Sequence, residues 1–144
     1  MNVETILRNK GNRVATIRPD ALIEEAVDRL RQMGIGALIV SVDGETVDGI
    51  VSERDVVIAL ADVGANLLSR SVSEIMTAKV VTCEPSDSVA ELMAEMTTRR
   101  IRHFPVVQDG RLCGIVSIGD LVKNRLDEIE SEASSLRSFI AGNA

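Results

Sequence analysis

The residues best suited to chemistry are two Ser-x-x-Asp segments, Ser52–Asp55 and Ser117–Asp120, which we call the first and second corners. Each follows Gly-Ile-Val and precedes an apolar helical pattern, so a strand is expected to run into a helix at each serine. Unpaired backbone N–H groups at a helix N-terminus favour phosphate or polar sugar groups. The serine hydroxyl adds a hydrogen-bond donor, and the aspartate can accept from the vicinal hydroxyls of a ribose.

The same spacing also has a purely structural interpretation. Ser-x-x-Asp before an apolar helical run is a capping box, which stabilises the helix by about 1 kcal/mol without any ligand. The two roles are compatible. For each aspartate we favour a ligand role, and for each serine both interpretations stay open.

The two corners belong to an internal repeat. Gly49–Asp55 and Gly114–Asp120 are identical at five of seven positions, at an offset of 114 − 49 = 65 residues. Further matches upstream pair Thr16–Pro19 with Thr82–Pro85 and Val40–Gly44 with Val106–Gly110. Such self-similarity indicates two copies of one supersecondary unit.

Each copy predicts the element order β-α-β-β-α, an α/β (α+β) fold. A short β-rich run (14–17 or 80–83) ends at a proline, and Asp20 or Ser86 offers an N-cap to an amphipathic helix. Two further strands are joined by Asp43-Gly44 or Asp109-Gly110, a strong hairpin signal. We expect the first repeat to span residues 1–70, with the N-terminal segment, and the second to span 71–144. One copy leaves an apolar sheet face uncovered, so the copies are expected to pack through their sheets with pseudo-two-fold symmetry.

Composition excludes several classes of function. The net charge is −6 and the chain has no Trp or Tyr, so neither a phosphate backbone nor stacked bases are expected as partners. Apolar stretches are far shorter than the roughly 20 residues of a membrane helix, and no signal peptide is evident, so we expect a cytoplasmic protein without membrane contact. One His and no Cys-x-x-Cys argue against a metal site, and no catalytic arrangement is evident, so an enzyme is not expected.

The repeated Gly-Ile-Val-Ser-x-x-Asp signature, with the Arg-His-Phe-Pro-Val run at 102–106, resembles the cystathionine-beta-synthase-type (CBS) domain pair, or Bateman module, of stand-alone bacterial type. The resemblance covers about residues 14–123. It implies a cleft for an adenine nucleotide (AMP, ADP or ATP, with NAD(H) a further candidate), in which Asp55 and Asp120 hold ribose while Ser52 and Ser117 contact ribose or phosphate. Adenine would be enclosed by residues of the first and second strands of each copy: Thr16, Arg18, Ala37, Ile39, Thr82, Cys83, His103, Phe104 and Pro105.

A basic cluster precedes the strand that begins near His103. Arg102 and His103 could contribute to a phosphate clamp, although strand alternation allows at most one of them to point into a given pocket. Arg99 and Arg100 are expected to complement the dipole of the preceding helix and face water. Arg54 is a further phosphate candidate in the first copy. The two sites are expected to differ, because Ala37-Leu38-Ile39 stands where the second copy has His103-Phe104-Pro105.

Beyond Asp120 the sequence predicts a long C-terminal helix. Apolar residues recur at the 4-3-4-3-4 spacing of a heptad seam: Val122, Leu126, Ile129, Ala133, Leu136 and Ile140. Packing along the chain's own body is one interpretation, and we favour a role in a homodimer. The leading functional hypothesis is a homodimeric energy or redox-state sensor that acts on an unknown effector protein. The alternative is a structural dimerisation adaptor with vestigial ligand pockets.

Overall fold

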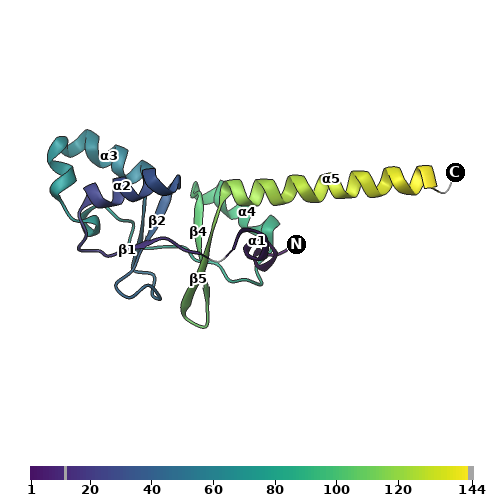
Figure 1. Ribbon diagram of the computed structural model, residues 1–144, viewed down its shortest axis with the longest axis horizontal. Helices are drawn as coiled ribbons and strands as arrows, with labels where there is room; N and C mark the ends of the chain where they lie inside the picture. Colours follow the sequence, from purple (N-terminus) through teal and green to yellow (C-terminus); the bar gives the residue numbers. More distant parts are fainter. Residues whose placement is uncertain (12, 143–144) are drawn as a thin grey trace.

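The computed structural model describes residues 1–11 and 13–142 and contains two repeats (Figure 1). The first has the predicted order β-α-β-β-α, and the second has the same order without its first strand. The first repeat consists of β1 (Thr16–Ile17), α2 (Ile23–Met33), β2 (Ala37–Val40), β3 (Gly49–Ser52) and α3 (Glu53–Val63). The second contains α4 (Val89–Arg99), β4 (His103–Gln108), β5 (Arg111–Ser117) and α5 (Ile118–Gly142). Helix α1 (Val3–Lys10) precedes the first repeat, and the 3-10 turns η1 (Ala65–Ser69) and η2 (Val72–Glu74) connect the two. The tandem architecture and the long C-terminal helix are thus confirmed.

Each repeat has its own small sheet. In the first, β1 runs parallel to β2 and β3 runs antiparallel to it, with Ala37 opposite Ser52. In the second, β4 and β5 form an antiparallel pair with His103 opposite Ser117. Both serines of the corners therefore lie at the last position of a strand, paired with the first residue of the preceding strand.

Three local predictions were wrong. Residues 80–83 do not form a strand, and only a single bridge joins Cys83 to Val106. The side chains of Asp20 and Ser86 are not the N-caps: α2 begins after Leu22 without a side-chain cap, and α4 is capped by Ser88. The predicted hairpin of β2 and β3 is present, but residues 41–48 between them form a loop longer than a tight turn, in which Asp43 accepts hydrogen bonds from the backbone of residues 45 and 46.

The two repeats exchange terminal segments. Val3 and Ile6 of α1 are buried in the hydrophobic cluster of the second repeat, beside Phe104 and Leu121. Conversely, Val72 of the connecting segment is buried in the cluster of the first repeat. Each repeat is therefore completed by residues that lie outside its β-α-β-β-α unit, so the expected boundary at residue 70 does not separate two self-contained packing units.

The face of the first sheet that is turned away from its own hydrophobic cluster is buried as well. Leu38 and Val40 of β2 belong to the first repeat's cluster, so strand alternation turns Ala37 and Ile39 to the opposite face. Both are nonetheless buried. A backbone hydrogen bond from Leu112 N to the Glu45 carbonyl, 2.7 Å long, also joins β5 to the loop of the first sheet.

Helix α5 leaves the body after its first turns. Figure 1 shows it as a straight rod that extends well beyond the sheets and the other helices. Within its described residues only Leu121 is buried. Its apolar side chains farther along the helix therefore face solvent in a single copy of the chain.

Candidate functional site

Both corners form the complete capping box that their spacing predicts. The Asp55 carboxylate oxygen Oδ2 accepts from Ser52 N at 2.8 Å and from Ser52 Oγ at 3.0 Å, while Asp55 N donates to Ser52 Oγ at 3.3 Å. The corresponding distances at Ser117 and Asp120 are 2.8, 3.0 and 3.2 Å. All the acceptor bonds of each box use Oδ2. The other carboxylate oxygen is therefore the one that could accept from a ligand while the cap stays intact.

The first corner opens into a cleft between the repeats, with a cavity volume of about 340 Å³. One side is formed by the first repeat at Ser52–Asp55, and the other by residues 79–81 and 100–103 of the second repeat. Gly36 lies close to both sides of the cleft: a Cβ there would lie 3.4 Å from His103 Nε2 and 3.0 Å from Glu53 Oε1. The complete lining is Gly36, Ile50, Ser52, Glu53, Arg54, Asp55, Thr77, Lys79, Val80, Val81, Arg100, Ile101, Arg102 and His103.

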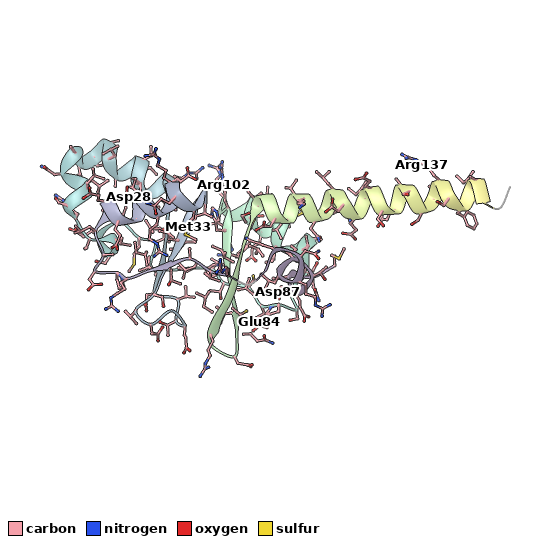
Figure 2. The ribbon with its side chains drawn as sticks, viewed as in Figure 1. Asp28, Met33, Glu84, Asp87, Arg102 and Arg137 are labelled. Carbon is pink, nitrogen blue, oxygen red and sulfur yellow. The ribbon has the colours of Figure 1, made fainter. Side chains whose placement is uncertain are left out.

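Positive charge gathers around this cleft. Arg54, Lys79, Arg100 and Arg102 all line it, against the two carboxylates of Glu53 and Asp55. Figure 2 shows Arg102 beside the end of β4, at the side of the first repeat. On a chain whose net charge is −6, this local excess of cations favours an anionic ligand.

His103 lies between the two corners. It lines the cleft of the first corner and is paired with Ser117 of the second through the β4–β5 ladder. Burial lowers its pKa, as does the positive charge of Lys10, while Asp120 and Glu53 act in the opposite direction. The ring is therefore neutral at pH 7 and can serve as a hydrogen-bonding group but not as a phosphate-binding cation.

The second corner is occupied by a side chain from the N-terminal helix. Lys10 Nζ lies 2.6 Å from Asp120 Oδ2 and donates to the Ile115 carbonyl at 2.9 Å. Burial raises the pKa of Asp120, but the hydrogen bonds from Lys10 and Ser117 outweigh this and the net pKa is lowered. Asp120 is thus an ionised carboxylate with a cation already bound, whereas Asp55 has its own capping contacts and faces an open cleft.

The structure brings together only part of the predicted site. Ser52, Arg54, Asp55, Arg102 and His103 share one cleft. Ser117 and Asp120 form the second corner. The remaining predicted residues lie elsewhere. Thr16 and Arg18 line a separate hollow of about 600 Å³ beside Asp43, and Thr82 is exposed. Cys83 and Phe104 belong to the hydrophobic cluster of the second repeat, and Ala37, Ile39 and Pro105 are buried.

Several lining residues were missed from the sequence. Lys79, Val80 and Val81 come just before Thr82 in the sequence and line the cleft, but were not among the predicted residues. Arg100 is exposed, as expected, and also lines the cleft; it adopts a left-handed conformation (φ 56°) where the chain turns from α4 into β4. Arg99, in contrast, binds Glu95 on its own helix, 2.9 Å away, as its position suggests. Thr77 and Glu53 carried no sequence signal for this role.

Within residues 1–11 and 13–142, no group of three or more His, Cys, Asp or Glu side chains is placed to hold a metal ion. Over the same residues, no helix combines the length and apolar character needed to cross a membrane. Burial raises the pKa of the Cys83 thiol to about 12, so this cysteine is a small buried apolar residue.

Comparison with known proteins also finds two copies of one unit in the chain. The CBS domain family model matches residues 6–62 and 72–127. The chain is 37% identical over 127 residues to "CBS domain-containing protein CBSX3, mitochondrial" of Arabidopsis thaliana, a match that covers 85% of this chain and 62% of that protein. The chain thus spans less than two thirds of that relative's length.

Solved structures show the same fold. The crystal structure of the CBS-domain containing protein ATU1752 from Agrobacterium tumefaciens matches with 47% identity and a TM-score of 0.84, over 87% of this chain and 99% of that one. The CBS domain pair of protein MJ0100, solved with 5-methylthioadenosine and S-adenosyl-L-methionine, matches with 26% identity and a TM-score of 0.79, over 89% and 98% of the two chains. CBS domain pairs are regulatory, nucleotide-binding modules and in general are not catalytic. Because the family model matches the chain twice, once over each structural repeat, this chain belongs to the CBS domain family and carries a CBS pair.

Proposed function

We propose that this CBS pair is a regulatory sensor that binds an adenine nucleotide in the cleft of the first corner. AMP, ADP and ATP are the leading candidates, and NAD(H) is the next. The observation that carries the proposal is the cleft itself, which has a volume of about 340 Å³. Asp55 lines it together with four cations, Arg54, Lys79, Arg100 and Arg102. This volume is within the range of roughly 300–1,000 Å³ that is usual for small-molecule sites.

Each part of a nucleotide has a complementary group in the cleft. Asp55 can accept hydrogen bonds from the ribose hydroxyls through the carboxylate oxygen that the capping box does not use. The four cations can bind phosphate groups, and bidentate arginine contacts are strong for phosphate. Val80, Val81 and Ile101 provide apolar surface for the base. The adenosine-containing ligands in the MJ0100 structure support this choice of ligand class.

A ligand that spans this cleft contacts both repeats at once. The first repeat contributes Ser52–Asp55 and the second contributes residues 79–81 and 100–103. Binding there changes the relative stability of arrangements of the two repeats only to the extent that the ligand prefers one of them. We propose that a homodimer of the chain uses this preference to report energy or redox state to an effector protein.

Calorimetric titration of the full chain with AMP, ADP, ATP and NADH tests the proposal. We expect at least one of them to bind, and we expect Asp55→Ala and Arg102→Met to weaken binding at least tenfold. Arg99→Met is the matched control, because Arg99 precedes Arg102 by three residues in the sequence but binds Glu95 outside the cleft. Its affinity should equal that of the unmodified chain.

The alternative is a structural adaptor that uses no ligand. It is favoured by the fact that both corner aspartates already accept capping hydrogen bonds, and that Asp120 also binds Lys10. A thermal-shift screen separates the two functions, since a ligand at 100 times its dissociation constant adds about 2.7 kcal/mol of stability. No stabilisation by any of the four nucleotides would leave the adaptor as the function.

A further inference from the structure

No other part of the chain that the structure describes covers the apolar stripe of α5. Its seam residues are 39% exposed at Val122 and 65% exposed at Ile140, with Leu126, Ile129 and Leu136 between these values. The family model ends at residue 127, so most of this stripe lies beyond the CBS pair itself. Figure 1 shows that this part of the helix projects away from the body.

The heptad positions of α5 can be assigned from the seam. Leu126, Ala133 and Ile140 occupy position a, and Val122, Ile129 and Leu136 occupy position d. Five of the six positions that flank the seam carry charge: Lys123, Glu130 and Arg137 at e, and Arg125 and Glu132 at g; the last g position is Phe139. The outermost positions, Asn124, Ser131 and Ser138, are polar. An apolar seam with charged flanks and a polar opposite face is typical of a helix in a coiled coil, and less so of a helix that packs one face on a protein core.

We propose that α5 pairs with α5 of a second copy as a parallel, in-register, two-stranded coiled coil. In this arrangement each g residue faces the e residue five positions farther along the other helix. Arg125 then faces Glu130 of the second copy, and Glu132 faces Arg137 of the second copy. The two-fold axis repeats both pairs, so every charged g residue meets an opposite charge.

The antiparallel arrangement gives the opposite result. If the seams overlap fully, Val122 packs beside Ile140 of the second copy, and e residues face e residues while g residues face g residues. Lys123 would then lie beside Arg137, and Glu130 and Glu132 would each lie beside their own copies. Like charges at every one of these positions disfavour the antiparallel pair.

The apolar seam drives association, and the flanking charges select the orientation. Exposed ion pairs contribute little individually, so they act mainly by excluding the alternative. Arg125 must exchange its contact with Glu128 on its own helix, 3.3 Å away, for the contact across the dimer. Arg137 projects from the distant half of α5, where the rest of the chain does not approach it (Figure 2).

This inference does not depend on the proposed nucleotide, because an adaptor with empty clefts would pair in the same way. The test uses the full chain with Cys113→Ser, so that partly buried Cys113 cannot cross-link and buried Cys83 remains in place. Leu136→Cys then places one thiol at a d position. In the parallel pair the two thiols meet at the two-fold axis, and mild oxidation should yield a covalent dimer.

In the antiparallel pair, residue 136 of one helix lies beside residue 126 of the other. The two thiols at residue 136 are then ten positions apart along the helix axis, or about 15 Å at about 1.5 Å per residue. No disulfide should form. Ser138→Cys is the matched control, because position f points away from the seam in either orientation. Failure of Leu136→Cys to cross-link, or equal cross-linking of Ser138→Cys, would overturn the proposal.

Charge reversal provides a second measurement by sedimentation equilibrium. Glu130→Arg should weaken the dimer several-fold, because it places two arginines together in each parallel pair. Adding Arg125→Glu to the same chain should restore the affinity. In an antiparallel pair Glu130→Arg would only replace one like-charge contact by another. A chain that sediments as a monomer, or as a trimer or tetramer, contradicts the two-stranded pairing.

Discussion

The ion pair between Lys10 and Asp120 provides the sharpest test of how the N-terminal helix is held on the second corner. We expect Lys10→Met to lower the free energy of unfolding by about 1 kcal/mol. Hydrogen bonds to charged groups contribute about 1.5–3 kcal/mol when buried, whereas exposed ion pairs contribute about 0.2–1 kcal/mol. The two side chains are 34% and 24% exposed and the atoms are 2.6 Å apart, so an intermediate value is expected. The melting temperature should fall by about 3–4 °C.

A double-mutant cycle isolates this contact from the other roles of its members. Urea unfolding of Lys10→Met, Asp120→Asn and the double variant should give a coupling free energy near 1 kcal/mol. Arg8→Met with Glu4→Gln is the control cycle on the same helix. Their ion pair is 3.2 Å long with side chains 74% and 53% exposed, so its coupling should be only about 0.3 kcal/mol.

The coupling should also depend on pH with a defined sign. The pKa of Asp120 is lowered on folding, so its contribution is fully present above the unfolded value of about 3.9 and is lost as the pH falls through the folded value. The Lys10–Asp120 coupling measured at pH 7 should therefore vanish in strong acid. A coupling at pH 7 no larger than that of the Arg8–Glu4 control would refute the assigned role of Lys10.

The same contact limits access to the second corner. A ligand that uses Asp120 must compete with Lys10, and about 1 kcal/mol corresponds to roughly a fivefold change in affinity. Should calorimetry find a second site at Asp120, Lys10→Met ought to strengthen it by about that factor without changing the site at Asp55.

Two further predictions concern the contact between repeats and the packing at the strands. The pKa of His103, the single histidine, is lowered first by burial and then by Lys10, so folded protein takes up its proton at lower pH than unfolded protein does. The free energy of unfolding should decline as the pH falls below about 6.5. In denaturant titrations at several pH values, His103→Gln should remove the part of this decline that is due to His103. An unchanged dependence of the free energy of unfolding on pH would contradict the assignment. Gly49→Ala should cost about 1–3 kcal/mol, because its Cβ would lie 3.0 Å from the Thr77 carbonyl oxygen, which is held by Ile50 N. Gly114→Ala should cost less, because the three atoms nearest to its Cβ all belong to the Leu7 side chain, which can move, and not to the backbone. Equal losses in urea unfolding would contradict this comparison.

Much of the fold followed from local sequence signals. The repeat of Gly-Ile-Val-Ser-x-x-Asp predicted both strand ends and both capping boxes, because a cap depends on residues only three positions apart. The Asp109-Gly110 turn was also predictable: both residues have positive φ angles, 53° and 77°, which these residue types tolerate. Where the sequence was wrong, as in the loop at Asp43 and the uncapped start of α2, the alternatives differ by small local preferences that packing overrides.

What the sequence alone determined, then, is the duplicated unit, its element order and the two corners. The tertiary structure decided what each corner faces. Lys10 reaches Asp120 from 110 positions away, and Arg100 reaches the cleft of Asp55 from the other repeat. No periodicity or spacing encodes such contacts, because they arise only when α1 packs on the second repeat and the connecting segment packs on the first. This exchange of segments makes one corner open and the other occupied, although their seven-residue signatures are nearly the same.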